Sequence, residues 1–265
     1  MKELNFHRAD SIASAVAAVK AAPAGKYLAG GQSLLPVLKL EMAEPSDLIS
    51  ISRIKDLRNI VASGNKLVIG AAVTHAEVAA SPEVQKAIPG LAALASHIGD
   101  AQVRNRGTLG GSVAHADPAA DYPAALVALG ATVKTDRRTV PAEDFFTGLF
   151  ETALEADELV VAVHFPIPER AAYAKFASHA SKYALCGVMV AKDASGVRVA
   201  VTGAGPSVFR VPEMEKALSA AFAPASLDGI KVSSDDLLSD GQASADYRAH
   251  LVTVMAKRAV AAAAG

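Results

Sequence analysis

Apolar and polar residues along the first fifty positions follow a pattern that predicts a small α/β unit. The alanine-rich stretch 11–22 is typical of a helix, and residues 34–42 predict a second one. Short apolar runs at 26–29 and 47–51 are typical of strands. Strands that alternate with helices in so short a segment favour a compact α/β arrangement.

The second region begins with a predicted β-hairpin, in which residues 57–62 and 66–71 flank the turn Ser63-Gly64-Asn65. Thr74 stands three residues before Glu77, a capping-box spacing that predicts the start of a helix. Pro82 and Pro89 divide the following residues into short helical pieces that end near Ile98. Further along, the pattern predicts a helix, a strand and a buried strand at 121–129, 132–135 and 159–165.

The third region follows Pro166-Ile167-Pro168, which we interpret as a linker because two closely spaced prolines disfavour a continuing helix or ladder. Three apolar stretches predict strands at 172–176, 186–192 and 197–202. Two segments with apolar residues at helical spacing predict helices at 212–222 and 245–263. Several strands followed by helices indicate an α+β tail.

Composition and charge exclude several classes of protein. Of 265 residues, 51% are apolar, which is too many for a disordered chain, and 26 basic against 27 acidic residues give no field that favours nucleic acid. The single cysteine, Cys186, cannot form an internal disulfide or by itself hold an iron–sulfur cluster. Charge is scattered through residues 1–8, unlike a secretory signal, so we expect a cytoplasmic protein.

The first segment with candidate chemistry is Ala29-Gly30-Gly31-Gln32-Ser33, between a predicted strand and a predicted helix. Paired glycines allow a tight turn in which backbone N–H groups point at a phosphate, and Gln32 and Ser33 add side-chain donors. The helix that follows adds its positive N-terminal end. The alternative is a tight turn with no ligand, which by itself is the more common use of such a pair.

The second segment runs from Ile98-Gly99 through Thr108-Leu109-Gly110-Gly111 to Asp121. Two separate glycine pairs with hydroxyl neighbours can clamp the two phosphates of a dinucleotide, and Asp121 can accept hydrogen bonds from a ribose. A stretch of this length without a clear helix or strand usually has a functional reason. In the alternative interpretation the glycines serve bulges and Asp121 only caps its helix.

Other candidate sites are weaker. Gly203-Ala204-Gly205 begins like a dinucleotide fingerprint, but Pro206 interrupts the helix start and the third glycine is missing. His115, Asp117 and Asp121 have no known metal-ligand spacing, so capping and turn roles are favoured over a metal site. Cys186 lies in an apolar run typical of a buried structural residue. The sequence therefore offers no metal site and no catalytic nucleophile or general base of its own.

Two long motifs closely resemble the FAD-binding medium subunit of molybdenum hydroxylases, the family of carbon monoxide dehydrogenase and xanthine dehydrogenase. They are Ala-Gly-Gly-Gln-Ser-Leu at 29–34 and Gln-Val-Arg-Asn-Arg-Gly-Thr-Leu-Gly-Gly-Ser-Val-Ala-His-Ala-Asp-Pro-Ala-Ala-Asp at 102–121. The resemblance implies an α+β fold of the vanillyl-alcohol-oxidase type. Two FAD-binding α/β subdomains would span 1–55 and 56–166, and a C-terminal domain with a small antiparallel sheet would span 169–265.

The resemblance also implies the positions of the cofactor contacts, with non-covalent FAD and no catalytic side chain in this chain. Residues 29–33 would bind the pyrophosphate together with Thr108, Gly110 and Gly111. Asp121 would meet the adenosine ribose, Ile98 and Gly99 would line the cleft, and Tyr183 would lie near the isoalloxazine. His179 and Lys182 stand where many relatives have arginine and aspartate, so an ion pair beside the flavin does not carry over.

By this resemblance the chain is an electron-transfer subunit. Electrons would reach it from a large molybdopterin subunit through a small iron–sulfur subunit, in a dimer of heterotrimers. An alternative is a free-standing FAD oxidase or reductase of the same fold, which the lack of an acid/base cluster disfavours. A scaffold that has lost FAD is disfavoured because both glycine pairs and Asp121 are intact. The substrate of the complex and the final electron acceptor stay open.

Overall fold

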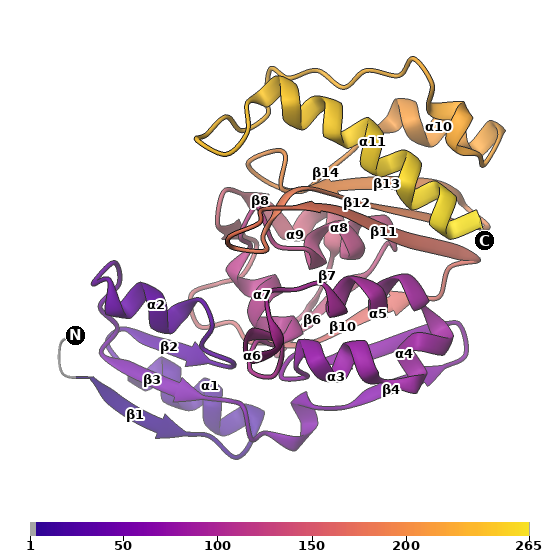
Figure 1. The fold of residues 1–265 in the computed structure, drawn as a ribbon. Coiled ribbons are helices and arrows are strands. Elements are labelled where there is room, and N and C mark those ends of the chain that lie inside the picture. The colour runs from indigo at the N-terminus through magenta and orange to yellow at the C-terminus, as the bar shows by residue number, and fades with distance from the viewer. Residues whose placement is uncertain (1–3, 265) are drawn as a thin grey trace.

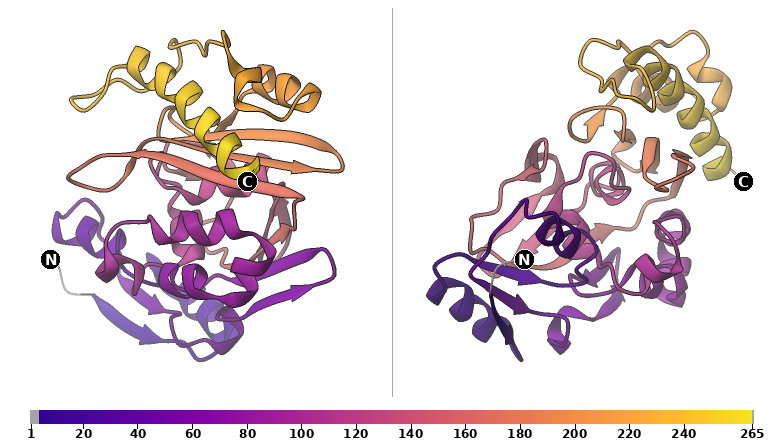
Figure 2. Two further views of the ribbon diagram at one scale, coloured as in Figure 1. Left: turned by 45° about the vertical axis from the view of Figure 1, so that its right-hand side comes forward. Right: turned by 60° about the vertical axis from the view of Figure 1, so that its left-hand side comes forward.

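The computed structural model describes residues 4–264, so residues 1–3 of the N-terminal segment discussed above lie outside the described range. Three larger sheets follow one another along the chain. Figures 1 and 2 show the N-terminal sheet at one end of the molecule, the C-terminal sheet with helix α11 at the other end, and the second sheet between them. None of the helices within 4–264 combines the length and the apolar character that crossing a bilayer requires.

The N-terminal sheet is parallel, with the strand order β1-β3-β2. Its elements are β1 (Asn5–Arg8), α1 (Ile12–Ala21), β2 (Gly25–Leu28), α2 (Leu34–Lys39) and β3 (Asp47–Ser50). The predicted elements are confirmed, although α2 ends three residues early because Glu41 has a φ of 57°. β1 was not predicted, because this edge strand is exposed along its length and carries no apolar alternation.

The second sheet is antiparallel, with the strand order β4-β5-β10-β6-β7. Its strands are β4 (Ile60–Ser63), β5 (Lys66–Gly70), β6 (Thr132–Thr135), β7 (Thr139–Pro141) and β10 (Val160–Pro166). The helices between them are α3 (His75–Ala80), α4 (Pro82–Ala87), α5 (Pro89–Ser96), α6 (Ala101–Arg104), α7 (Leu109–His115), α8 (Tyr122–Ala128) and α9 (Ala142–Phe145). The capping box of Thr74 and Glu77 is confirmed, as is the division of the helices at Pro82 and Pro89.

Two parts of this region differ from the sequence prediction. The glycine-rich stretch after Ile98 is helical in two places, α6 and α7, where the sequence predicted irregular chain. Asp100 caps α6 and Thr108 caps α7, and the cap of α7 offsets the poor helix propensity of its two glycines. Residues 139–152 form β7, α9 and the small hairpin of β8 (Phe146–Gly148) and β9 (Glu151–Thr152), which are too short for periodicity to indicate.

The C-terminal sheet is antiparallel and is buried on both faces. Its strands, in order, are β11 (Arg170–Ala177), β12 (Ala184–Asp193), β13 (Gly196–Thr202) and β14 (Phe209–Arg210), and the helices on its outer side are α10 (Pro212–Ala220) and α11 (Ala245–Ala264). Along β12, Val188 and Val190 join the core under α11, whereas Met189 and Ala191 join the core of the second sheet. The predicted α+β class with a small antiparallel C-terminal sheet is confirmed. One hydrophobic core extends from the second sheet to the C-terminal sheet. The division of the chain into three separate domains therefore stays a prediction.

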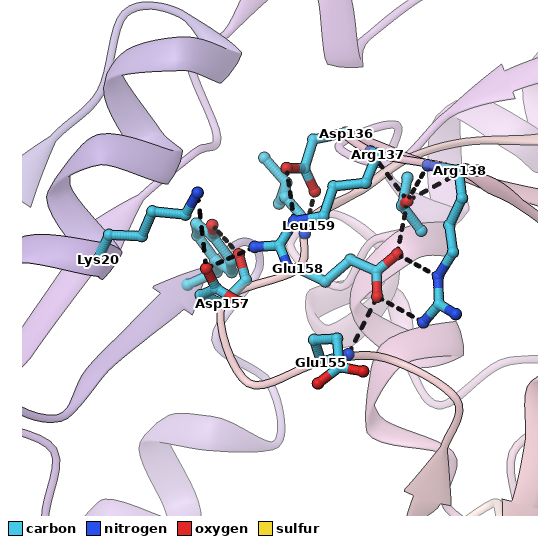
Figure 3. Close-up of polar contacts among 10 residues, drawn as sticks. Lys20, Asp136, Arg137, Arg138, Glu155, Asp157, Glu158 and Leu159 are labelled. Atoms are coloured by element: carbon cyan, nitrogen blue, oxygen red, sulfur yellow. Dashed lines mark hydrogen bonds and ion pairs between the residues drawn. The ribbon is translucent and has the colours of Figure 1, made fainter.

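A polar network joins the N-terminal unit to the second sheet (Figure 3). Lys20 of α1 lies 3.8 Å from the carboxylate of Asp157, and Tyr27 of β2 donates a hydrogen bond to the backbone carbonyl of Asp157. Beside them, the guanidinium of Arg138 donates to both oxygens of Glu158, at 2.9 and 2.8 Å. The contacts of Lys20 and Tyr27 with Asp157 link the N-terminal sheet to the second sheet.

Glu158 is expected to stabilise the fold in a pH-dependent way. Its hydrogen bonds, above all from Arg138, lower the pKa of its carboxyl from 4.5 to about 2. The contribution is therefore complete above about pH 4.5 and is lost as the pH falls through about 2. Because solvent screens the half-exposed Arg138, we expect Glu158→Gln to lower the free energy of unfolding by about 1–2 kcal/mol at pH 7.

Urea unfolding of both proteins from pH 7 to pH 3 measures this effect. The difference between them should shrink below about pH 4.5. Glu213→Gln, which changes an exposed carboxyl on α10, is the control. A difference that stays constant over the whole pH range would contradict the assignment.

Candidate functional site

The first glycine segment forms the turn between β2 and α2. Gly31 has a φ of 73°, in the left-handed region that favours glycine, so a turn that residues with a Cβ rarely adopt is built here. The backbone N–H groups of residues 30–33 donate to no other group in the described part of the chain. Four neighbouring amides without partners at a left-handed turn are a suitable set of donors for an anion.

The second glycine segment forms the start of α7. The hydroxyl of Thr108 accepts a hydrogen bond from the Gly111 amide at 3.1 Å and so caps the helix. Gly110 is buried: its amide donates to the Ala71 carbonyl at 2.9 Å, and a Cβ at this position would overlap Ala71. These glycines allow close packing and a helix start, so the alternative that they serve β-bulges is wrong.

The two glycine segments meet in the structure. A Cβ on Gly30 would overlap the carbonyl of Arg106 and approach the Cα of Gly107 to 2.8 Å, so only glycine permits this approach. On the other side, a Cβ on Gly111 would lie 3.7 Å from the Cβ of Ala29. Segments about eighty residues apart in the sequence therefore form one continuous backbone surface.

A cavity of about 390 Å³ opens beside this junction, and both Ala29 and Thr108 line it. Arg58 and Arg106 bring positive charge to its wall. Glu77 partly offsets this charge, because its carboxylate lies 2.6 Å from the guanidinium of Arg58. The cavity thus reaches the junction at Ala29 and Thr108, and the charged side chains of its wall are two arginines and one glutamate.

Asp121 lies in a second cluster, at the contact between α8 and the C-terminal sheet. Its carboxylate is buried and accepts hydrogen bonds from the Tyr173 hydroxyl at 2.6 Å and from the Lys175 Nζ at 3.0 Å. Burial raises the pKa of the Asp121 carboxyl, and the charge of Lys175 acts against this rise. Asp121 makes no side-chain cap to α8, so the alternative that it only caps the helix is wrong.

Sequence reasoning missed Tyr173 and Lys175, although β11 carries a signal for both. The strand is rich in small apolar residues, and Tyr173 and Lys175 lie two positions apart, on the same face. A lysine on the inner face of such a strand needs a buried acid, because an unpaired charge there is costly. Its ammonium group also donates to the carbonyl of His97 at 3.2 Å, which brings the predicted residues Ile98 and Gly99 into this cluster.

The other residues predicted to contact the cofactor are Ile98, Gly99 and Tyr183. Arg104 donates to the carbonyls of Ile98 and Gly99, so these two residues sit at the end of α5 with fixed backbone. Tyr183 is 45% exposed, and burial of the rest of its ring raises the pKa of its hydroxyl, with Asp117 and Asp121 adding to the rise.

Asp117 accepts a hydrogen bond from the amide of Ala119, which confirms its turn role. Cys186 is fully buried, as predicted.

The arrangement fits a dinucleotide cofactor, whose pyrophosphate is negatively charged. The amides of residues 30–33 have no partner in the described chain, and they lie at a junction that an added side chain would fill. The carboxylate of Asp121, the residue that the sequence predicts to bind the ribose, is buried in a second cluster. The model for the FAD binding domain in molybdopterin dehydrogenase matches residues 2–168 of this sequence. The chain belongs to this family. The expected FAD cofactor and the oxidoreductase class are thereby confirmed.

Relatives in this family cover nearly the whole chain. The nicotine 6-hydroxylase medium subunit of Paenarthrobacter nicotinovorans is 39% identical over 89% of this chain and 88% of its own length. The carbon monoxide dehydrogenase medium chain of Hydrogenophaga pseudoflava is 36% identical over 97% of this chain and 96% of its own. A putative xanthine dehydrogenase FAD-binding subunit of Escherichia coli is 30% identical over 98% of this chain and 97% of its own.

Solved structures agree with this assignment. Carbon monoxide dehydrogenase from Hydrogenophaga pseudoflava superposes with a TM-score of 0.90 at 36% identity, over 99% of this chain and 97% of that one. Quinoline 2-oxidoreductase from Pseudomonas putida 86 gives a TM-score of 0.88 at 30% identity, over all of this chain and 98% of that one. The predicted family resemblance is therefore correct over the full length of the chain.

Proposed function

We propose that this protein is the FAD-carrying electron-transfer subunit of a heteromeric molybdenum hydroxylase. The observation that carries the proposal is the junction of the two glycine segments, where the amides of residues 30–33 have no partner in the described chain. When bound, FAD supplies the redox chemistry, and the protein supplies binding, orientation and electrostatics. The chain accordingly needs no nucleophile of its own.

The pyrophosphate would lie at this junction. Amides of residues 30–33 would donate to its oxygens, with Gln32 and Ser33 as further side-chain donors. Thr108 and Gly111 would form the opposite wall, where Gly111 keeps the approach to Ala29 free of a side chain. Gly110 would act indirectly: by packing on Ala71, it lets the start of α7 reach the junction.

The adenosine end would lie toward the second cluster. A carboxylate offers about four lone-pair sites, so Asp121 can accept from a ribose hydroxyl while it keeps Tyr173 and Lys175 as donors. Ile98 and Gly99 would line the cleft beside it. Tyr183 would shield the isoalloxazine, and its half-exposed ring would leave that end of the cofactor accessible to a partner.

The partners we propose are a small iron–sulfur subunit and a large molybdopterin subunit, in a dimer of heterotrimers. Several relatives are named as medium subunits or medium chains, which supports a multi-subunit assembly. Exposed apolar side chains support a contact around Tyr183: Leu40 and Met42 follow α2 and are 71% and 74% exposed. Figures 1 and 2 place α2 and the β11–β12 turn, which carries Tyr183, at the same side of the molecule.

Acid precipitation of the purified complex tests the cofactor assignment. We expect FAD to leave with the supernatant without proteolysis, because Cys186 is fully buried and no histidine lies in a motif for covalent attachment. The flavin absorbance of supernatant and pellet measures the distribution. Yellow colour that stays with the denatured chain would show a covalent flavin, and a complex without flavin would contradict the proposed function.

A further inference from the structure

His75, the first residue of α3, lies directly beneath the second glycine segment. Its side chain is buried, and its backbone amide donates to the Gly107 carbonyl at 3.0 Å. A Cβ built on Gly107 would come within 2.6 Å of the imidazole Nε2 and 2.9 Å of Cδ2. Gly107 therefore rests on the imidazole ring itself, and Thr74 pairs with Thr108 in an isolated antiparallel bridge beside it.

The other side of the His75 ring contacts Tyr122, the residue that follows Asp121 in the sequence. Its Nδ1 lies 3.3 Å from the hydroxyl of Tyr122, and the two ring centroids are 5.4 Å apart. Tyr122 is fully buried and directly follows Asp121 at the start of α8. One buried imidazole thus touches both the glycine junction and the residue next to the buried carboxylate.

The ring is suited to a fixed position between these two elements. Burial lowers the pKa of His75 to about 4, and the positive charge of Arg104 acts in the same direction, so the ring is neutral at neutral pH. A neutral imidazole has one donor and one acceptor nitrogen, so it can bond to the Tyr122 hydroxyl without burying a charge. Neither the family match nor the glycine motifs assign a role to this residue.

We propose that His75 is a positioning residue for the cofactor, which sets the distance between the second glycine segment and the Asp121 end of the site. The inference rests on the proposed FAD site. The physical reason is that a close-packed contact transmits a displacement of one atom to its neighbour, whereas a cavity does not. If the ring is removed, the Gly107 backbone loses its support and the phosphate donors lose their preorganised spacing.

The contact between Gly107 and His75 allows a double-mutant cycle. In the full-length apoprotein, we expect His75→Ala and Gly107→Ala each to raise the FAD dissociation constant roughly tenfold or more, since each displaces the same backbone. Gly107 does not have a left-handed φ, and the nearest atoms that an alanine methyl group would meet there belong to the imidazole and the Val103 carbonyl. In the double variant the new methyl group fills the space of the lost ring, so its dissociation constant should be no higher than that of either single variant.

Two further variants separate positioning from general stability. Tyr122→Phe keeps the packing and removes only the hydroxyl contact, so its effect on FAD affinity should be smaller than that of His75→Ala. Leu251→Ala removes a buried side chain from the separate core under α11 and should lower the melting temperature without changing FAD affinity. Flavin fluorescence titration measures the affinity, and the visible circular dichroism of the bound flavin reports its environment.

The outcomes distinguish this inference from the function on which it rests. A wild-type apoprotein that does not bind FAD would overturn the proposed function. If the wild type binds FAD and His75→Ala binds it equally well, or if the effects of His75→Ala and Gly107→Ala multiply in the double variant, only the positioning role is overturned. Should His75→Ala fail to fold, Gly107→Ala and Tyr122→Phe still decide: unchanged FAD affinity in both would contradict the inference.

Discussion

Valine in place of Gly111 is expected to weaken FAD binding strongly while the fold survives. The new Cβ would lie 3.7 Å from the Cβ of Ala29 and 2.9 Å from the Thr108 hydroxyl, so the branched side chain enters the gap between the two glycine segments. Loss of the Thr108 cap costs about 1 kcal/mol, which a chain of this size tolerates. Loss of close backbone approach to the pyrophosphate should lower FAD affinity by about two orders of magnitude or more.

Matched glycines elsewhere in the chain control for the substitution. Gly241 has no atom within 4 Å of an added Cβ, so Gly241→Val should leave FAD binding unchanged. Gly31→Val, whose φ of 73° adds backbone strain, is compared with Gly64→Val in the β4–β5 turn, where φ is 57° and the surroundings are open. FAD content after gel filtration and the melting temperature of the apoprotein are measured for each. Full FAD content in both Gly31→Val and Gly111→Val would show that the cradle is wrongly placed.

The isolated chain is expected to show no reduction of its flavin by an organic hydroxylase substrate, whereas the assembled complex reduces it. Within residues 4–264 no group of side chains could hold a metal ion, and the single cysteine cannot build a cluster. The buried carboxylate of the site, Asp121, is already engaged by Tyr173 and Lys175. A single catalytic group already contributes about 10²–10⁴-fold to the rate of a reaction. We therefore expect the complex to reduce its flavin about three orders of magnitude or more faster than the isolated chain does.

Anaerobic stopped-flow measurement of flavin bleaching decides this prediction. The FAD-loaded chain alone, the chain with the iron–sulfur partner and the complete complex are each mixed with an aldehyde, a purine or another hydroxylase substrate. Dithionite serves as the control that the flavin in the isolated chain is reducible. Rapid bleaching of the isolated chain by a substrate would replace the subunit assignment with the free-standing oxidase.

Elements with a strong local pattern could be predicted from the sequence. The capping box at Thr74, the prolines at 82 and 89 and the apolar run of β12 each depend on neighbours within a few residues, so the chain itself specifies them. Edge strand β1 and the hairpin of β8 and β9 could not be predicted, because they are short and lack a buried face. Helix α7 was missed because its glycines argue against a helix, whereas the Thr108 cap, the contact with Ala71 and the burial of Leu109 and Val113 in the core stabilise it.

For the site, the sequence by itself determined which residues have the chemistry: two glycine pairs, their hydroxyl neighbours and one acidic residue in fixed order along the chain. Tertiary structure decided how they are used. It placed Gly30 against Arg106 and Gly107, gave Gly110 a packing role, and surrounded Asp121 with Tyr173 and Lys175 from a strand more than fifty residues away. It also placed His75 against Gly107 and the hydroxyl of Tyr122. Local residue types set the conformations and bonds that are possible, but contacts between distant segments exist only once the cores have packed, so periodicity and motif spacing carry no signal for them.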